Sequence, residues 1–191
     1  MDKLDAALFI HTIEHDEDAH VCLAHPEGLH RVKEAISTYQ TDVVVFDVLR
    51  DFSSGDLNSD QFMTEACRAI GSVTRTGNAQ RIPLVLHHAL TGRAGAAKAT
   101  GFDRGSFGRN SKVLQGWTRA QINLAPYNSD ANDVLVVASG KANDCVEFDP
   151  FAVRLNSKTM IYEPDENVDL SSWRDRVLTG AEQSRKRVGV K

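Results

Sequence analysis

Two short apolar runs separated by an amphipathic stretch constrain the fold of this chain more than any other feature. Residues 42–49 are DVVVFDVL and residues 81–89 are RIPLVLHHA. Continuous β-branched and aliphatic runs of this length are typical of strands buried on both faces of a parallel sheet. Between them, apolar residues recur at helical spacing up to residue 76, with Asn58 or Ser59 as the N-cap and Gly77-Asn78 at the end. The pattern predicts a right-handed βαβ unit.

The rest of the chain alternates short strands with amphipathic segments. Pro26 is suited to the first turn of a helix over residues 27–38. A second amphipathic helix is predicted over 171–178. Alternation and β-branched residues predict short strands at 6–13, 20–24, 119–125, 133–139, 145–148, 152–155 and 159–162.

Length and composition bound the class of protein. A chain of 191 residues is expected to form one domain, here over 1–183, with a basic tail at 184–191. The net charge of −4 provides no global basic field for nucleic acid, so such binding needs a local patch. No apolar run approaches the ~20 residues of a membrane span. Three widely spaced cysteines do not suggest a disulfide framework, so a reducing cytoplasm is the expected location.

Three side chains that follow predicted strands are candidates for chemistry. Asp47 ends the first apolar run, and the carboxyl ends of parallel strands are where open α/β sheets bind ligands. His87 and His88 end the second run, where a neutral imidazole could bond a phosphate or its attacking water. Lys141, just past a later strand, could act as a cationic finger on a neighbouring subunit. The alternatives are a turn or cap acid, a structural histidine and a solvated lysine.

Residues 91–110 differ in amino-acid composition from the rest of the chain. Five glycines and four basic residues occur among these twenty, with no apolar period. We expect a mobile loop, and its cations interleaved with Phe102 and Phe107 suit a single nucleic-acid strand. The alternative is a solvated loop. The nucleic-acid candidates are Arg93, Lys98, Arg104, Arg109 and Lys112.

Four motifs in one order carry a family resemblance. VVVFDVLRDFSSGDLNSD resembles the Walker B segment of RecA-like ATPases of the plasmid replicative-helicase (RepA) type. LVLHH, GRNSKVLQGWTRAQINL and SGKAND resemble later segments of the same group, and the match covers about residues 20–163. The resemblance implies an α/β fold: a mostly parallel, twisted RecA-like sheet with helices on both faces and antiparallel strands added towards the C-terminus.

The same resemblance implies functional roles. Asp47 would hold Mg²⁺, directly or through water, His88 would sense the γ-phosphate of ATP, and Lys141 would act in trans within a ring of identical subunits. The loop over residues 92–109 would face a central channel and contact single-stranded DNA. The implied activity is ATP hydrolysis coupled to DNA during plasmid or phage replication.

One departure from the family matters more than the match. ATP hydrolysis in this group needs G-x-x-x-x-G-K-[ST], whose backbone N–H groups hold the phosphates, and the sequence does not contain it. The nearest string begins at Gly92, has the wrong spacing and follows the wrong strand. The chain therefore looks like the C-terminal part of such an ATPase: a truncated gene, one half of a split protein whose P-loop a separate chain would supply, or a descendant without catalysis. By itself it should not hydrolyse ATP well. The alternative is a non-catalytic nucleic-acid-binding or assembly module on the same fold.

Two further readings have less support. A hydrolase using His87 or His88 with Asp47 is possible, but no Gly-x-Ser-x-Gly elbow accompanies them. Histidines at 11, 15, 20, 25 and 30 raise the question of zinc, and we expect scattered surface histidines instead. Cys67 lies on the apolar stripe of its helix and is expected to be a small buried residue.

Overall fold

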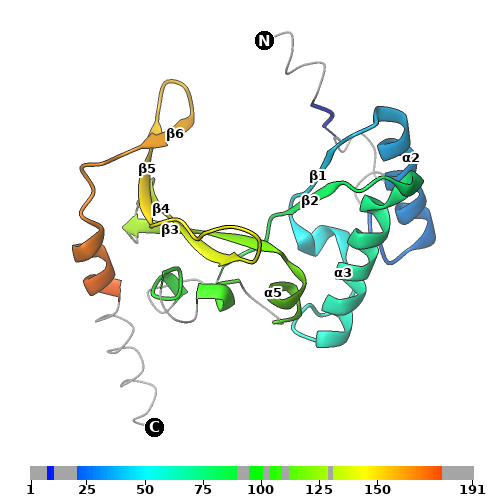
Figure 1. The fold of residues 1–191 in the computed structure, drawn as a ribbon, viewed down its shortest axis with the longest axis horizontal. Coiled ribbons are helices and arrows are strands. Elements are labelled where there is room, and N and C mark those ends of the chain that lie inside the picture. The colour runs from blue at the N-terminus through cyan, green and yellow to red at the C-terminus, as the bar shows by residue number, and fades with distance from the viewer. Residues whose placement is uncertain are drawn as a thin grey trace. The chain divides into compact units, whose positions relative to one another are not determined.

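The computed structural model describes residues 8–10, 21–89, 95–100, 104–108, 112–128 and 131–177. The chain divides into two compact units, Met1–His87 (unit 1) and His88–Lys191 (unit 2). Figure 1 shows helices and two strands in unit 1, and a larger sheet in unit 2. Among the described residues, no helix has both the length and the apolarity needed to cross a membrane. The predicted tail at 184–191 lies outside the described residues.

Unit 1 is a small α/β layer. Its β1 and β2 pair in parallel, with Val43 opposite Ile82 and Phe46 opposite Val85. The helix α3 connects them, which confirms the predicted βαβ order. The elements of unit 1 are α2 (Pro26–Tyr39), β1 (Val43–Phe46), the 3-10 helix η2 (Leu49–Phe52), α3 (Asp60–Thr74), the 3-10 helix η3 (Thr76–Asn78) and β2 (Ile82–Val85).

Local sequence explains the helix boundaries of unit 1. Pro26 occupies the first turn of α2, where its missing N–H costs nothing. The helix ends at Gln40, which adopts the left-handed conformation (φ 52°) and donates its N–H to Ile36. Ser59 is the N-cap residue of α3, as predicted, although its side chain makes no capping hydrogen bond. After α3, Gly77 adopts φ 69°, which glycine tolerates without a Cβ clash.

The core of unit 1 lies on one side of the β1–β2 pair. Met63, Ile70 and Val73 of α3 are fully buried, as are Phe46 of β1 and Leu49 of η2. The stripe of apolar residues read from the sequence is therefore the buried face of α3. The described residues 21–24 form no strand, contrary to the prediction, and neither do residues 8–10.

The other side of the β1–β2 pair is largely exposed to solvent. Val43 and Val45 are 48% and 51% exposed, and Ile82 and Leu84 are 66% and 52% exposed. The prediction that these strands are buried on both faces is therefore wrong for the chain as it stands. The two apolar runs have the sequence of interior strands, yet about half or more of each of these four residues is exposed.

Unit 2 is built on an antiparallel sheet with the order β3-β4-β5-β6. The hairpin β3–β4 confirms the strands predicted at 119–125 and 133–139. Residues 145–148 are not a strand, and the strand predicted at 159–162 begins only at Ile161. The elements are η4 (Arg104–Ser106), α5 (Val113–Trp117), β3 (Ala120–Asn128), β4 (Ala131–Ala142), β5 (Phe151–Asn156) and β6 (Ile161–Pro164). Residues 170–177 are helical, as predicted.

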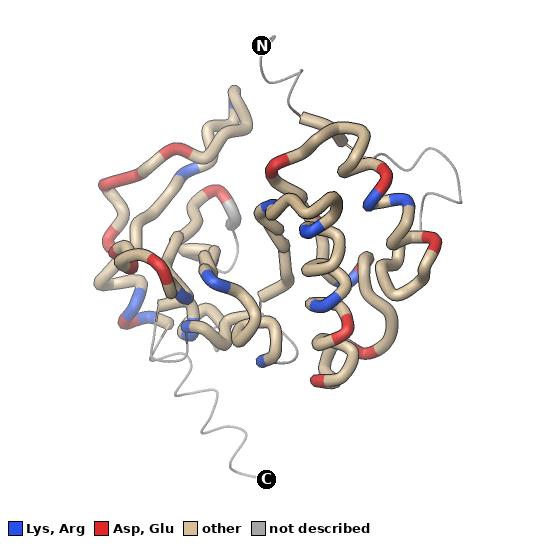
Figure 2. Tube along the Cα trace, turned by 45° about the vertical axis from the view of Figure 1, so that its right-hand side comes forward, with Lys and Arg blue, Asp and Glu red and all other residues tan. Residues whose placement is uncertain are grey.

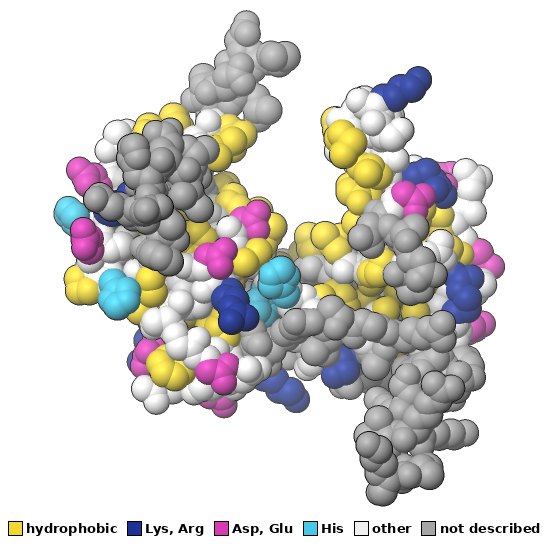
Figure 3. Space-filling view, turned by 180° about the vertical axis from the view of Figure 1, so that it is seen from behind, with side chains coloured by type: hydrophobic (Ala, Val, Ile, Leu, Met, Phe, Trp, Pro, Cys, Tyr) yellow, Lys and Arg dark blue, Asp and Glu magenta, His cyan; other side chains and the backbone are white. Residues whose placement is uncertain are grey.

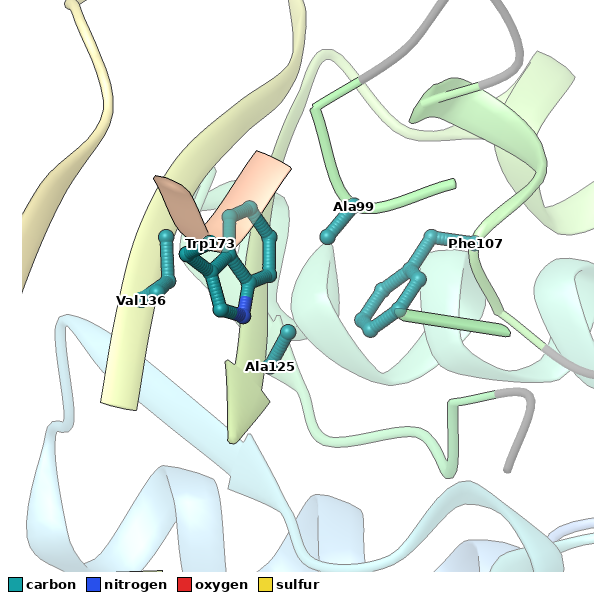
Figure 4. Close-up of a cluster of buried hydrophobic side chains, with 5 residues drawn as sticks. All are labelled: Ala99, Phe107, Ala125, Val136 and Trp173. Carbon is teal, nitrogen blue, oxygen red and sulfur yellow. The ribbon is translucent and has the colours of Figure 1, made fainter. Parts of the chain in front are cut away.

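One face of this sheet carries the core of unit 2. Trp173, from the helical residues 170–177, is 2% exposed and packs against Ala125 of β3 and Val136 of β4 (Figure 4). Its indole N–H donates to the Pro126 carbonyl at 3.3 Å, which satisfies the polar group of this buried ring. Ala99 and Phe107, from the glycine-rich segment, complete the cluster.

The fold is therefore α/β, with a small parallel two-stranded sheet and a separate four-stranded antiparallel sheet. A continuous RecA-like sheet, mostly parallel and covered by helices on both faces, stays a prediction.

Candidate functional site

The carboxyl ends of β1 and β2 remain side by side beyond the last ladder pair. The Leu86 N–H donates to the Phe46 carbonyl, and the Leu49 N–H donates to the Leu86 carbonyl, each at 2.9 Å. These two bonds bracket Asp47 and hold its backbone beside the segment that leads to His87. The edge predicted from the apolar runs therefore exists within unit 1.

Asp47 presents its carboxylate to solvent at this edge. The residue is exposed, and no hydrogen bond or ion pair involving its carboxylate is found within the described residues. The peptide bond to Val48 is cis. An exposed carboxylate at a strand end has the oxygen chemistry that Mg²⁺ prefers, since this ion is commonly held by one or two carboxylates, waters and phosphates.

The two histidines fall on either side of the boundary between the units. His87 ends unit 1, is half-buried and has an interaction partner within the protein. His88 begins unit 2 and is exposed. Of the pair, His87 therefore shares a compact unit with Asp47. The proposed phosphate-sensing role of His88 stays a prediction.

Lys141 has a structural role that the sequence did not reveal. Its ammonium donates to the carbonyls of Gln115 and Thr118, each at 2.7 Å, and of Gly116 at 3.4 Å. These carbonyls lie at the C-terminal end of α5, where a cation offsets the unpaired acceptors and the partial negative charge. An ammonium has three N–H donors, so these three contacts use all of them. A role in trans would require Lys141 to leave this site.

The glycine-rich segment is only partly described, and its described residues are held in place. Arg104 forms an ion pair with Glu147, and Phe107 is 5% exposed. Phe107 is therefore part of the core and not an exposed ring of a loop, and nucleic-acid binding by this segment stays a prediction. Lys98 is half-buried and Lys112 is exposed. Arg93, Arg109 and Phe102 lie outside the described residues.

A buried amide fastens this segment to the sheet. The side chain of Asn123, 1% exposed, donates to the carbonyls of Ala99 (3.0 Å) and Arg104 (2.8 Å). Its oxygen accepts a hydrogen bond from Gln121 at 2.8 Å. A Cβ on Gly140 would approach the Asn123 oxygen to 2.7 Å, so glycine is needed there. The only sequence indication was an Asn at a core-facing position of an alternating strand.

The charges of the described residues do not form a single-sign surface. Figure 2 shows acidic and basic residues interspersed along both units. Arg119 pairs with Asp144 and lowers the pKa of that carboxyl, and Arg154 pairs with both Asp133 and Asp165. Among the described residues of unit 2, three arginines are therefore paired with carboxylates of the same unit.

No group of three potential metal ligands occurs among the described His, Cys, Asp and Glu residues. His25 and His30 are exposed, and the remaining three of the early histidines lie outside the described ranges. Cys67 is 2% exposed, as predicted, and burial raises the pKa of its thiol to about 11.

A pocket of about 320 Å³ lies elsewhere on unit 1. Its lining comes from Leu23–Ala24, from residues 52–54 after η2, and from one side of α3, with Glu65 and Arg68 as its charged members. Asp47 does not line this pocket. The pocket therefore adds nothing to the strand-end site.

The chain matches no protein-family model, and no curated protein is significantly similar to it. Its function is therefore inferred from its own residues.

Proposed function

We propose that this chain is the nucleotide-facing remnant of a RecA-like ATPase of the replicative-helicase type, lacking the element that holds the phosphates. The observation that carries the proposal is the parallel β1–α3–β2 unit, which sets Asp47 and His87 at adjacent carboxyl ends of strands. In open α/β sheets this edge is the usual place for a ligand.

The carboxyl ends of β1 and β2 offer a ligand for Mg²⁺, but the chain alone offers no binding site for a triphosphate. The Asp47 carboxylate supplies an oxygen ligand, and the remaining positions of the ion would be filled by water. ATP needs a backbone cradle with several N–H groups and a lysine, and the sequence has no such motif. We therefore infer that ATP hydrolysis needs a P-loop supplied from outside these 191 residues, with His88 near the γ-phosphate and a ring of subunits as the working assembly.

The metal half of the proposal is tested with a paramagnetic probe. Mn²⁺, added in place of Mg²⁺, should broaden backbone NMR signals around Asp47, and Asp47→Asn should abolish the effect. Asp42→Asn is the matched control, because Asp42 is equally exposed but precedes the other end of β1. Equal broadening around both residues would contradict a strand-end site.

The nucleotide half is tested by turnover. The purified chain should hydrolyse no ATP above background in Mg²⁺, because the phosphate cradle is missing. ATP hydrolysis by the purified chain that is lost in Asp47→Asn would show that these residues hydrolyse ATP without a P-loop motif. That result would contradict the inference that a phosphate-binding element is missing.

A variant of Lys141 tests whether this residue acts on a neighbouring subunit or stabilises the C-terminal end of α5. Lys141→Met removes the ammonium and keeps the apolar stem. We expect a loss of about 1–2 kcal/mol in unfolding free energy, because three carbonyls of α5 lose a charged donor, measured by urea denaturation. Lys112→Met, on an exposed residue, should cost much less. Unchanged stability would leave Lys141 available to a neighbouring subunit.

The second candidate is a non-catalytic nucleic-acid-binding or assembly module. It is favoured by the internal use of Lys141 and by the absence of a P-loop motif. Binding of labelled single-stranded DNA, followed by anisotropy, should weaken and show a shallower salt dependence in the double variant Arg104→Ala/Arg109→Ala if the loop contacts phosphates. An unchanged titration would remove DNA from both candidates.

A further inference from the structure

The pocket of unit 1 has two aromatic walls, Phe52 and Phe62, that the fold holds in place. The ring of Phe52 packs edge-on against the buried ring of Phe46, with centroids 5.3 Å apart. Its backbone carbonyl accepts a hydrogen bond from the Leu23 N–H at 2.9 Å. Phe62 lies directly against Gly55, where a Cβ would approach the ring to 2.6 Å. The two walls are therefore formed before any ligand arrives, which lowers the entropic cost of binding.

The floor of the pocket is a stripe of short side chains on α3. Ala66 and Ala69 follow Phe62 by four and seven residues, so the three lie on one side of the helix. A neighbouring stripe of α3, with Met63 and Ile70, is fully buried in the core. Two alanines beside the larger ring leave a hollow of about 320 Å³. Sites for small molecules typically begin at roughly 300 Å³ and are mostly apolar.

Two opposite charges, Glu65 and Arg68, border this hollow. They are three residues apart on α3, so their side chains begin as neighbours on the helix surface. Glu65 accepts one hydrogen bond, from Gln61 at 3.1 Å. Within the described part of the chain, Arg68 has neither a hydrogen bond nor an ion pair. Both charged groups are therefore available to a ligand at the same border of the pocket.

Exposed charges are ordinary on this unit, and their position decides what they mean. Figure 3 shows hydrophobic, acidic and basic side chains intermixed on one face of unit 1. The pocket differs from that surface because a carboxylate and a guanidinium border an apolar hollow with two fixed rings. An anionic ligand would gain Arg68 but be repelled by Glu65, and a cationic ligand would meet the reverse. A ligand that carries both charges on one carbon atom satisfies both residues.

We propose that the pocket binds a free α-amino acid with an aromatic or other apolar side chain. The carboxylate of the ligand pairs with Arg68, its ammonium pairs with Glu65, and its side chain lies between Phe52 and Phe62. Aromatic rings favour offset or edge-to-face contacts of this kind. The proposal uses neither Asp47 nor the histidines, so its failure would leave the proposed ATPase ancestry untouched.

Three probes with the same phenyl ring test the proposal by NMR titration of the full chain. L-phenylalanine carries both charges, 2-phenylethylamine lacks the carboxylate, and 3-phenylpropionate lacks the ammonium. We expect L-phenylalanine to shift the signals of Ala66 and Ala69 with a dissociation constant on the order of 1 mM, as for other small ligands. Each single-charge probe should bind about threefold or more weakly, because one exposed ion pair is lost.

Substitutions in the pocket assign each charge. Arg68→Gln should weaken L-phenylalanine and leave 2-phenylethylamine unchanged, whereas Glu65→Gln should weaken L-phenylalanine and not 3-phenylpropionate. Both residues are exposed, so these variants should keep the fold. Ala69→Leu fills the hollow and should abolish binding of all three probes. The matched control is Arg75→Gln, which changes another exposed arginine at the end of α3 that does not line the pocket.

The pattern across probes and variants decides the outcome. Weaker L-phenylalanine binding in both pocket-charge variants, beside unchanged binding in the Arg75→Gln chain, would support the proposal. It would be overturned if L-phenylalanine caused no saturable shifts at concentrations tenfold above the expected dissociation constant. Equal affinities for the three probes would overturn it as well, because the charges would then select nothing.

Discussion

The two sheets of this protein each pack one face, but their packed faces are closed in different ways. In unit 1 the helix α3 covers the β1–β2 pair with aliphatic side chains such as Ile70. In unit 2 the cover is a single indole together with an irregular segment, and a buried amide, Asn123, holds that segment in place. A sheet face can therefore be covered without a long packed helix, by a few specific hydrogen bonds. The stability of such a cover depends on each of those hydrogen bonds.

The largest expected effect comes from removing the indole of unit 2. Trp173→Ala should lower the free energy of unfolding by about 3–5 kcal/mol, because a large buried ring leaves a cavity. Hydrogen exchange should rise in β3–β5 and stay slow in α3. Trp117→Ala, on a half-buried residue, is the control and should cost less. Equal loss of protection in both units would show that they unfold together and would break the comparison.

A smaller loss of unfolding free energy is expected from removing the Asn123 amide, which hydrogen-bonds the segment containing Ala99 and Arg104 to β3. Asn123→Leu removes the amide that donates to the carbonyls of Ala99 and Arg104, which should cost about 1–3 kcal/mol. Limited proteolysis should then cut faster near Arg104. Gln121→Leu removes the hydrogen bond to the Asn123 oxygen and a longer one, 3.4 Å, to the Arg104 carbonyl, and should have a weaker effect because both Asn123 donor bonds remain. If cleavage near Arg104 is unchanged, the segment is held by the apolar core alone.

The effect confined to the narrowest range of conditions concerns the buried thiol of Cys67 in unit 1 at high pH. Burial raises the thiol pKa of Cys67 from 9.0 to about 11, so above pH 9 the unfolded state loses this proton before the folded state does. Stability should therefore fall as pH rises from 9 to about 11, by at most about 1.4 kcal/mol per pH unit. Urea denaturation of Cys67→Ala should show a shallower decline over this range. Cys145→Ala, on an exposed thiol, should retain the full decline.

Features read correctly from the sequence were those set by neighbours along the chain. The helix predicted over 27–38 is α2, bounded by Pro26 and by the left-handed Gln40, and the βαβ order is confirmed because two apolar runs flank an amphipathic one. The burial of Cys67 followed from helical periodicity. The adjacent strand ends at Asp47 and His87 followed from the parallel pairing. Their chemical roles stay predictions.

Features that the sequence did not reveal were those set by neighbours distant in sequence. Phe107 was expected to face a nucleic acid, but it lies in the core because β3 and residues 170–177 complete a cluster around it. Arg104 was placed on an open loop, but Glu147 pairs with it across more than forty residues. Lys141 contacts three carbonyls in and just after α5, and its role in trans stays a prediction.

The sequence by itself determined which segments become helices and strands and which of their faces are apolar, because side-chain period and backbone propensity are local properties. Only the tertiary structure decided which apolar faces are covered, which cations are already paired and which polar groups are buried. Those outcomes depend on what packs on each surface in space, and a periodic pattern is the same whether its partner is present or not.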